Sequence, residues 1–371
     1  DETGSSMNSG SELFPFKSIS DAVSAAQASN VSFLGIHLYP GTYGGGDNLG
    51  LLFKLPTQIS PVLNKKTTGK AVAFVCDDKF PVAFVTDTDF ILDSNSMTTS
   101  ISNCANSIDQ HAGNLTVSGV DFTNFDSGVL SLKSGNLIVD TCSFTTKVAG
   151  AIGVSAIAEE GTNAVVKISH SVFVGCGFIA RKFSLGEVRY VKVSNISLTE
   201  EESPIFVNNG TWIVTSLHVS SCSTPGNGGG LGLYWIDRLM MGQSSFINVT
   251  AANGGAIYAD GIQNSIHIQD TVFQDNTASI GGALNIKKQL ILSEVAFLSC
   301  SANSGGAVAL TGVGYFEGLY FKEVTADTGA FVDCCPNQYL FDCASVLFVD
   351  KSSLHPPGTS EEEYNCDVVY Y

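Results

Sequence analysis

Short segments in which apolar and polar residues alternate follow one another along most of the chain, separated by turns rich in glycine, asparagine and serine. Alternation with a period of two predicts β-strands whose successive side chains point to opposite faces. A phenylalanine recurs inside these segments at an interval of about 25 residues, a repeat length typical of a solenoid with one coil per repeat. The clearest copies place Phe246, Phe273 and Phe297 ahead of the pairs Gly254-Gly255, Gly281-Gly282 and Gly305-Gly306.

The recurring phenylalanines predict an aromatic ladder inside the solenoid. Coils stacked as parallel strands lie about 4.8 Å apart, so equivalent side chains of successive coils come into contact. The Gly-Gly pairs predict a tight turn in each coil, where the backbone needs a positive φ or a close approach. The expected ladder positions are Phe122, Phe144, Phe173, Leu198, Val219, Phe246, Phe273, Phe297 and Phe321.

The first residues predict an arm and a helix. Residues 1–14 are polar and rich in glycine and serine, and we expect them to form an N-terminal arm. An amphipathic helix is predicted near 17–28, because Ile19, Val23 and Ala26 recur at helical spacing and Ser18 or Ser20 can cap the first turn. It is the one convincing amphipathic helix in the sequence.

The segments PFKSISDAV and IHLYPGTYGGGDNL follow one another in the first fifty residues. In order and spacing they resemble the opening of right-handed parallel β-helix proteins of the pectate-lyase-like kind. The resemblance implies that the helix covers the first coil and shields its core from water. The expected fold class is all-β: one right-handed parallel β-helix over 15–332 with a short N-terminal capping helix and, over 333–371, a disulfide-bearing C-terminal cap.

The phrases GGAI at 254–257, GGAL at 281–284 and GGAV at 305–308, with FQDN at 273–276, form a second motif set. They resemble the GGA[ILV] and FxxN repeats of the polymorphic outer-membrane proteins, which are secreted β-helical adhesins. The resemblance covers about the last third of the chain, and it implies an extracellular β-helix with a role in adhesion. The C-terminal membrane barrel of that family has no counterpart here, so we carry over neither its anchoring nor its route of export.

Charge narrows the range of partners. Charged residues make up 14% of the 371 residues, and 18 basic against 35 acidic side chains give a net charge of −17. Such a surface disfavours nucleic acid and anionic membranes as partners. No apolar run reaches the ~18 residues of a membrane span, so we expect no membrane insertion. The three arginines, Arg181, Arg189 and Arg238, are few for a protein that grips anionic polysaccharide.

Cysteines and glycosylation sequons favour secretion. Ten cysteines are many for a cytosolic chain of this length and favour an oxidising compartment. The opening residues resemble a mature end left by processing. We therefore expect a secreted protein of the extracellular space, located at a cell surface or in a matrix. The candidate N-glycosylation sites are Asn30, Asn114, Asn195, Asn209 and Asn248.

Cys176, Cys222 and Cys300 each follow a ladder position by three residues. Cys176 and Cys222 are expected two coils apart, or ~9.6 Å, which exceeds the ~7 Å between Cα atoms that a disulfide spans. We therefore expect buried free thiols, or thiols paired sideways to a loop. The disulfide candidates are the C-terminal residues Cys334, Cys335, Cys343 and Cys366, whose connectivity cannot be read from the sequence.

Acidic residues and histidines predict no catalytic site, no metal site and no cofactor. Polysaccharide lyases and hydrolases with the β-helix fold are similar in that their aspartates cluster on adjacent coils. In this sequence the one Asp pair, Asp77-Asp78, is expected in a solvated turn. The other acids near the ladder fall at different positions relative to it, namely Asp121, Asp270, Asp275 and Asp327. The histidines do the same and are expected to be isolated: His37, His111, His170, His218, His267 and His355.

Five aromatic residues are candidates for a platform on which sugar rings stack, although core or groove-lining roles are the favoured interpretation. These residues are Trp212, Trp235, Tyr234, Tyr39 and Tyr43. The expected function is a non-catalytic extracellular scaffold or adhesin. Its expected partners are surface or matrix glycans and proteins, or further copies stacked head to tail into filaments. The alternatives are a polysaccharide lyase or glycoside hydrolase of the β-helix type, and a carbohydrate-binding module without turnover.

Overall fold

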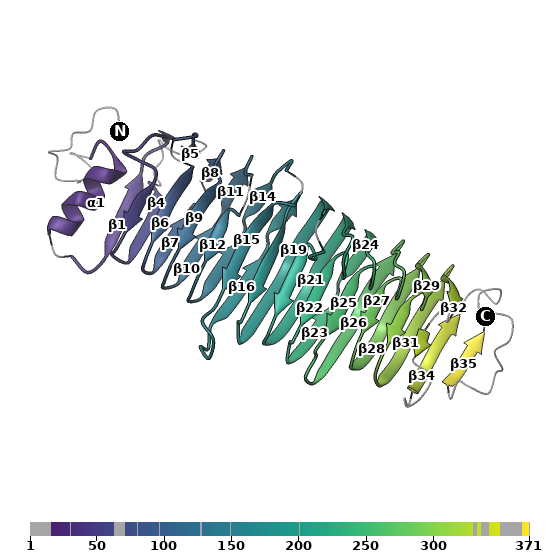
Figure 1. The fold of residues 1–371 in the computed structure, drawn as a ribbon. Coiled ribbons are helices and arrows are strands. Elements are labelled where there is room, and N and C mark those ends of the chain that lie inside the picture. The colour runs from purple at the N-terminus through teal and green to yellow at the C-terminus, as the bar shows by residue number, and fades with distance from the viewer. Residues whose placement is uncertain are drawn as a thin grey trace. The chain divides into compact units, whose positions relative to one another are not determined.

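The computed structural model describes residues 16–29, 31–62, 71–79, 81–95, 97–126, 128–148, 150–199 and 201–328, and the backbone alone of 332–334, 341–348 and 366–370. The chain divides into two compact units, Asp1–Phe173 (unit 1) and Val174–Tyr371 (unit 2). Each unit is a parallel β-solenoid, as the strand pairings show, so the expected fold class is confirmed (Figure 1). The predicted arm over 1–14 lies outside the described residues.

Unit 1 begins with helix α1 (Ile19–Ala28), in which Ser18 is the N-cap and its Oγ accepts a hydrogen bond from the Asp21 N–H. Each coil then adds two short strands to a first sheet and one strand to a second. The first-sheet strands are β1 (Leu34–Leu38), β2 (Gly41–Tyr43), β4 (Thr57–Pro61), β5 (Ala71–Val75), β7 (Phe90–Asp93), β8 (Thr98–Ser102), β10 (Leu115–Ser118), β11 (Val120–Thr123), β13 (Leu137–Asp140), β14 (Ser143–Thr145), β16 (Val165–Ser169) and β17 (Val172–Val174). The second-sheet strands are β3 (Leu51–Phe53), β6 (Val82–Thr86), β9 (Asn106–Gln110), β12 (Leu130–Leu132) and β15 (Ile152–Ile157).

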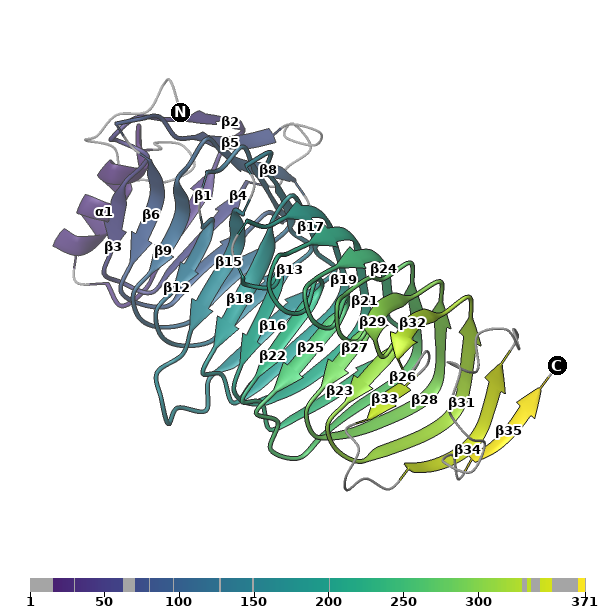
Figure 2. The ribbon, with the colours of Figure 1, turned by 45° about the vertical axis from the view of Figure 1, so that its right-hand side comes forward.

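Unit 2 repeats this plan with longer strands in its first sheet, because the two segments of a coil often run on as one strand with a bend (Figure 2). The first-sheet strands are β19 (Leu185–Ser197), β21 (Thr211–Ser223), β23 (Arg238–Gly242), β24 (Ser245–Thr250), β26 (Ser265–Gln274), β28 (Gln289–Leu298), β31 (Gly314–Lys322), β34 (Phe341–Phe348) and β35 (Cys366–Tyr370). The second-sheet strands are β18 (Gly177–Arg181), β20 (Ile205–Asn208), β22 (Leu231–Tyr234), β25 (Ile257–Asp260), β27 (Leu284–Ile286), β30 (Val308–Leu310) and β33 (Val332–Cys334). A further parallel pair consists of β29 (Ser301–Ser304) and β32 (Thr325–Thr328).

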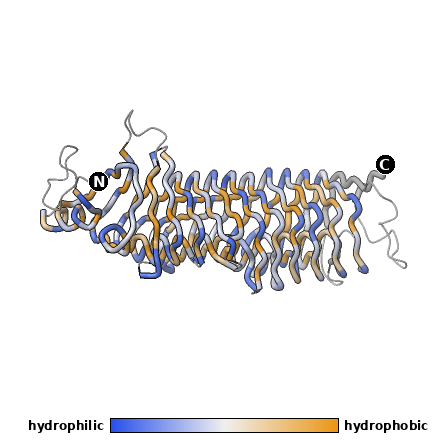
Figure 3. The backbone as a smooth tube through the Cα atoms, turned by 90° about the horizontal axis from the view of Figure 1, so that it is seen from above, coloured by the Kyte–Doolittle hydropathy of each residue, from blue (hydrophilic) through white to orange (hydrophobic). Residues whose placement is uncertain are grey.

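Alternation along the strands separates the core from the surface, as the alternating colours along the coils show (Figure 3). In β26, for example, Ile266, Ile268 and Phe273 are fully buried. Thr271 is buried as well, whereas Gln269 and Asp270 are exposed. The same positions are apolar in the next coil, since Ile266 pairs with Leu290 and Ile268 with Leu292. One-in, one-out spacing therefore continues from coil to coil in register.

Phenylalanines of successive coils lie directly over one another in both units. In unit 2 the ring centroids of Phe246 and Phe273 are 5.4 Å apart, those of Phe273 and Phe297 5.2 Å, and those of Phe297 and Phe321 5.1 Å. All four rings are at most 2% exposed. Burial of each ring contributes roughly 2–3 kcal/mol, and contact between offset rings adds about 1 kcal/mol. Unit 1 has the same column in Phe122, Phe144 and Phe173.

One ladder position was predicted wrongly. Val193, rather than Leu198, pairs with Val219, which in turn pairs with Phe246. Leu198 follows the end of β19 and is half-exposed. The coil that contains β19 has a valine at the ladder position, so the spacing alone pointed to a leucine five residues further along the chain.

The Gly-Gly pairs form the turn that leads into each second-sheet strand. Gly254 and Gly281 have φ values of 60° and 66°, which L-residues with a Cβ rarely adopt. Gly255 meets a different constraint, because a Cβ there would overlap the carbonyl oxygen of Gly282 in the next coil. The first glycine of a pair therefore supplies the backbone conformation, and the second allows the coils to approach.

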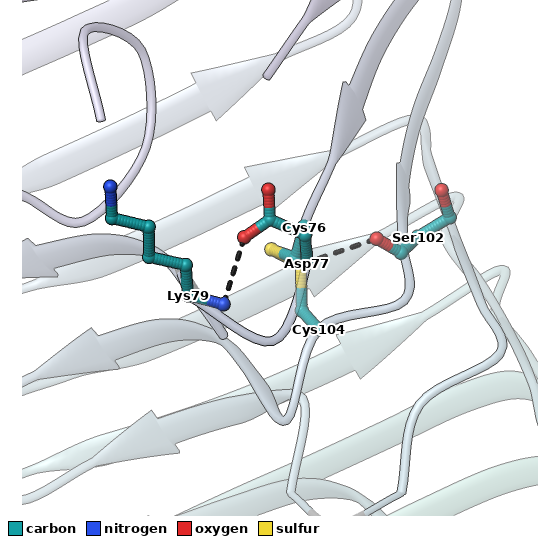
Figure 4. The surroundings of a disulfide bond; sticks show 5 residues. All are labelled: Cys76, Asp77, Lys79, Ser102 and Cys104. Carbon is teal, nitrogen blue, oxygen red and sulfur yellow. Dashed lines mark hydrogen bonds between the residues drawn. A yellow bond between two sulfur atoms is a disulfide. The ribbon is translucent and has the colours of Figure 1, made fainter. Parts of the chain in front are cut away.

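Cysteines occupy the inward corner positions. Cys76 and Cys104 form a disulfide between adjacent coils of unit 1, next to the hydrogen bond from the Cys76 N–H to the Ser102 carbonyl (Figure 4). The expectation that disulfides fall in the C-terminal group missed this bond, and the side chains of that group lie outside the described residues. As expected, Cys176, Cys222 and Cys300 are buried thiols, and burial raises the pKa of Cys222 to about 11 and of Cys300 to about 12. Burial also raises the pKa of Cys142 to about 12.

Candidate functional site

Four aromatic side chains gather on the outer face of the second sheet of unit 2. Phe206 on β20 and Tyr258 on β25 occupy the same outward column, and Gly232 on β22 lies between them in register. Gly232 has no side chain, and the space beside it holds the Ser203 side chain and the edge of the Tyr234 ring. The centroid of that ring lies 5.1 Å from that of Phe206 and 5.6 Å from that of Tyr258. We call Phe206, Tyr234, Trp235 and Tyr258 the aromatic surface. Tyr258 is only 6% exposed, and Phe206 and Tyr234 are half-buried, so Trp235 presents most of the accessible ring area.

Trp235 lies in the bend directly after β22 and is the most exposed large apolar side chain among the described residues, at 63%. Its indole covers Gly261 of the next coil. A Cβ on Gly261 would lie 2.7 Å from Cε3, 2.8 Å from Cδ2 and 3.2 Å from Cζ3, so the ring presents its face to the backbone there. The backbone thus supports one face of the indole and leaves the other open.

Two ion pairs border the aromatic surface. Arg181 donates to Glu202 at 2.9 Å and holds its guanidinium 4.9 Å from the centroid of the Phe206 ring. Lys287 donates to Asp260 at 2.8 Å and lies 5.4 Å from the centroid of the Tyr258 ring. Each cation therefore contacts both a carboxylate and an aromatic ring, a combination that holds both side chains in place.

Charge around this surface is balanced, in contrast with the net charge of −17 for the chain. The hydrogen bond from Lys287 holds the pKa of Asp260 below its ordinary value, and the same bond raises the pKa of Lys287. Tyr258 also donates to Asp260, at 3.1 Å. Burial raises the pKa of Tyr234, so this phenol stays protonated and can act as a hydrogen-bond donor. The surface therefore combines rings with donors and acceptors at neutral pH.

A second cluster lies in unit 1. The Nδ1 atom of His111 is 3.0 Å from Asp87, its Nε2 atom is 3.1 Å from Asp109, and Lys133 lies 3.3 Å from the same Asp109 carboxylate. His111 is 39% exposed, so the cluster is open to solvent. The expectation of isolated histidines is wrong here, and it is wrong for His170, which contacts Asp140 at 3.0 Å. Asp87 and His111 directly follow the paired residues Thr86 and Gln110, so they occupy equivalent positions in adjacent coils.

The other predicted chemical residues stay apart. Asp77 accepts a hydrogen bond from the Lys79 N–H in the turn after β5, near Cys76 (Figure 4). Among the described residues, no three His, Cys, Asp or Glu side chains lie close enough to hold a metal ion. Trp212 is buried and donates to the Asn209 carbonyl at 2.8 Å, and Tyr43 packs on Phe74 within unit 1. Of the predicted platform, Tyr234 and Trp235 are neighbours in unit 2, and in unit 1 the Tyr43 hydroxyl donates to the Tyr39 carbonyl at 2.7 Å.

The sequons fall into two kinds. The Asn114 amide donates to Asp89 at 3.1 Å and accepts from the Asn136 amide at 2.8 Å, so it is part of a polar ladder between coils. Asn195, Asn209 and Asn248 are exposed and have φ values of 59°, 70° and 54°. Their side chains make no hydrogen bond with any other described residue. Asn30 lies outside the described part of the chain.

The comparisons with known proteins give little to add. No family model and no curated protein matches the chain, so the resemblance to the polymorphic outer-membrane proteins stays a prediction. Among solved structures, the chain is similar to PfbA, a surface adhesin of Streptococcus pneumoniae, with 11% identity and a TM-score of 0.32 over 81% of this chain and 86% of that one. At this distance the likeness shows nothing about the function of this chain.

One observation bears on location. The Cys76–Cys104 disulfide is compatible with an oxidising, extracellular environment. Across the described residues, no helix has the length and apolar character needed to cross a membrane.

The residues that complete the aromatic surface were missed at the sequence level. Tyr234 and Trp235 were noticed because aromatic pairs are conspicuous, but Arg181, Glu202, Phe206 and Lys287 were not connected with them. They lie in different coils and share a face only through the register. A search of the sequence for outward residues at equal repeat positions would have found Phe206 and Tyr258.

Proposed function

We propose that this protein is a secreted, non-catalytic adhesin that binds carbohydrate at a cell surface, wall or matrix through the aromatic surface of unit 2. The observation that carries the proposal is Trp235, whose indole is supported on one face by Gly261 and open on the other. A pyranose ring has an apolar face of C–H groups that packs on such an indole, while its hydroxyls reach polar groups at the rim. Asp260 and Lys287 provide both acceptors and donors at that rim.

A neutral glycan fits this surface better than an anionic one. Arg181 and Lys287 are each already paired with a carboxylate, so neither leaves a free positive charge for a uronate or sulfate. The net charge of −17 adds a general repulsion of polyanions. We infer that the ligands are neutral hexose or N-acetylhexosamine chains.

A glycan array followed by calorimetry with purified protein tests this function. Trp235→Ala should weaken binding about 10- to 30-fold, the loss expected for removal of a central aromatic contact. Tyr315→Ala, at an outward position on β31 that is 42% exposed, is the matched control and should bind as the unmodified protein does. Absence of binding to any neutral glycan, or equal binding by the Trp235→Ala variant, would overturn the proposal.

The His111 cluster favours a second candidate, a β-helical polysaccharide lyase or glycoside hydrolase. An imidazole between Asp87 and Asp109, beside Lys133, provides acid and base groups in one place. Assays for reducing ends and unsaturated uronates, with and without calcium, should show no turnover if the protein is an adhesin. Turnover that is lost in His111→Ala would instead identify an enzyme, with its site in unit 1.

Assembly into filaments is the scaffold version of the proposal. The strands of each unit are parallel and in register, and a coil at the end of such a stack has unpaired backbone groups that another copy can satisfy. Electron microscopy at several protein concentrations should show end-to-end rows whose length increases with concentration. Dispersed single particles at every concentration would contradict this version and leave glycan binding unaffected.

A further inference from the structure

Asn209 and Trp235 occupy the same position in successive coils. Asn208 pairs with Tyr234, and the Asn209 N–H donates to the Tyr234 carbonyl at 3.1 Å. One coil further on, the Trp235 N–H donates to the Asp260 carbonyl at 3.0 Å, which places Gly261 next in the column. Adjacent coils are about 4.8 Å apart, so the Asn209 side chain starts within one sugar width of the indole.

The backbone directs both side chains out of the same bend. Asn209 has a φ of 70° and Trp235 a φ of 56°. Because the supported face of the indole lies on Gly261, its open face is on the side of Asn209. The column therefore consists of Asn209 in the sequon, then Trp235 with its open face toward Asn209, and then Gly261, which supports the other face.

We propose that Asn209 carries an N-linked glycan whose first sugar packs on the open face of Trp235. This inference rests on the proposed function in one respect, since the attached sugar would cover the indole that external carbohydrate binds. An attached sugar acts at an effective concentration in the millimolar range, which suffices to compete with a weakly bound external glycan. Glycosylation of Asn209 thus regulates adhesion, and removal of the glycan exposes the binding surface.

The covalent step is a glycosyl transfer to the Asn209-Gly210-Thr211 sequon. A bond forms between Asn209 Nδ2 and the anomeric carbon of an oligosaccharide donor that is linked to a lipid diphosphate. The bond from that carbon to the diphosphate oxygen breaks, and the amide proton lost from Nδ2 balances the charge on the leaving diphosphate. Donors of this class belong to the secretory route that the proposed function requires.

Folding limits when this transfer takes place. The Thr211 hydroxyl donates to Asp237 at 3.1 Å, and Gly210 packs so closely on the Phe183 carbonyl that a Cβ there would overlap it. The sequon is therefore held at the bend that leads into β21 once that strand has formed. We infer that the glycan is added to the unfolded chain and settles on Trp235 as the coils stack.

Tryptophan fluorescence tests the contact directly, because the chain has two tryptophans and Trp212 is buried. Protein secreted from a eukaryotic host is first mapped by glycopeptide mass spectrometry. Acrylamide quenching of Trp235 should be reduced by roughly half in the glycosylated protein, since the sugar covers the one open ring face. Asn209→Gln should restore quenching, whereas Asn248→Gln, which removes a matched Asn-x-Thr sequon on β24, should not.

Enzymatic trimming of the native protein adds an arm that needs no variant. An endoglycosidase that leaves the first sugar should preserve the protection of Trp235, and an amidase that removes the whole glycan should abolish it. The inference would be overturned if Asn248 were glycosylated and Asn209 were not. It would also be overturned if quenching of Trp235 were the same with and without the glycan. If protection is found but the deglycosylated protein binds no carbohydrate, the proposed function fails and this contact stands.

Discussion

Cys76 and Cys104 lie at equivalent corners of successive coils in unit 1, with Cα atoms 5.0 Å apart and a sequence separation of 28 residues. A disulfide requires a Cα distance below about 7 Å, so the spacing of parallel strands allows a bond between adjacent coils and forbids one between coils two apart. The bond therefore ties one coil to the next where the chain is least repetitive.

Removal of this disulfide should lower the free energy of unfolding of unit 1. Closing a loop of this length restricts the unfolded chain by about 3–4 kcal/mol. Cys76→Ser, Cys104→Ser and the double variant should therefore lose the same amount in guanidinium unfolding, because either single change breaks the bond. A double variant that loses the sum of the two single losses would show that the cysteines act independently.

Phe273→Ala should destabilise unit 2 by about 3–5 kcal/mol, because it opens a cavity between two stacked rings. Phe273→Leu retains apolar volume and should lose much less. Chemical denaturation followed by circular dichroism measures both. Equal stability of the two variants would contradict the cavity explanation, because Phe273→Leu keeps most of the apolar volume that Phe273→Ala removes.

Glycine substitutions separate the two constraints of the Gly-Gly turn. Gly45→Ala should cost about 1 kcal/mol, since Gly45 has a φ of 71° but no heavy atom within 4 Å of the point where a Cβ would lie. Gly255→Ala should cost about 3 kcal/mol, because its Cβ would overlap the Gly282 carbonyl oxygen and lie 2.9 Å from the Thr277 oxygen. Thermal melting of each variant gives the comparison, and the reverse order would contradict the close-approach explanation.

Asp260→Asn should reduce the stability of unit 2 at neutral pH but not in strong acid. The folded-state pKa of Asp260 is lowered, first by the hydrogen bond from Lys287, so its stabilisation is present above the unfolded pKa of about 3.9. That stabilisation is lost as the pH falls through the lowered folded pKa. Unfolding of the unmodified and variant proteins at a series of pH values should show a gap that closes in acid. Lys287→Gln should narrow the gap in the same way.

The repeat explains why the coils were predictable. Phe246, Phe273, Phe297 and Phe321 recur at nearly equal spacing, and burial of one face selects a single register. Where the coil around β19 places Val193 in the ladder, composition gave no signal, and the spacing pointed to the wrong residue. Local periodicity identifies strands, but the register of a coil of unusual length is defined only by its pairing with the adjacent coils.

The candidate site depends on contacts between coils that no local pattern records. Trp235 was noticed as an aromatic residue, yet its support comes from Gly261, which in the sequence is one glycine among 38. His111 meets Asp87 because the turns of two coils are adjacent, at a separation of 24 residues. Both associations follow from the register, which becomes known only when each coil is placed on the last.

The paired glycines have an evolutionary consequence. Gly255 and its equivalent Gly282 sit where a carbonyl group of the following coil takes the place of a side chain. Any β-solenoid whose backbone adopts this turn is selected for glycine at these two positions, whatever its ancestry. The phrase is thus a signature of local shape, and kinship among such proteins is better traced through outward residues such as Trp235, which the corner leaves free to diverge.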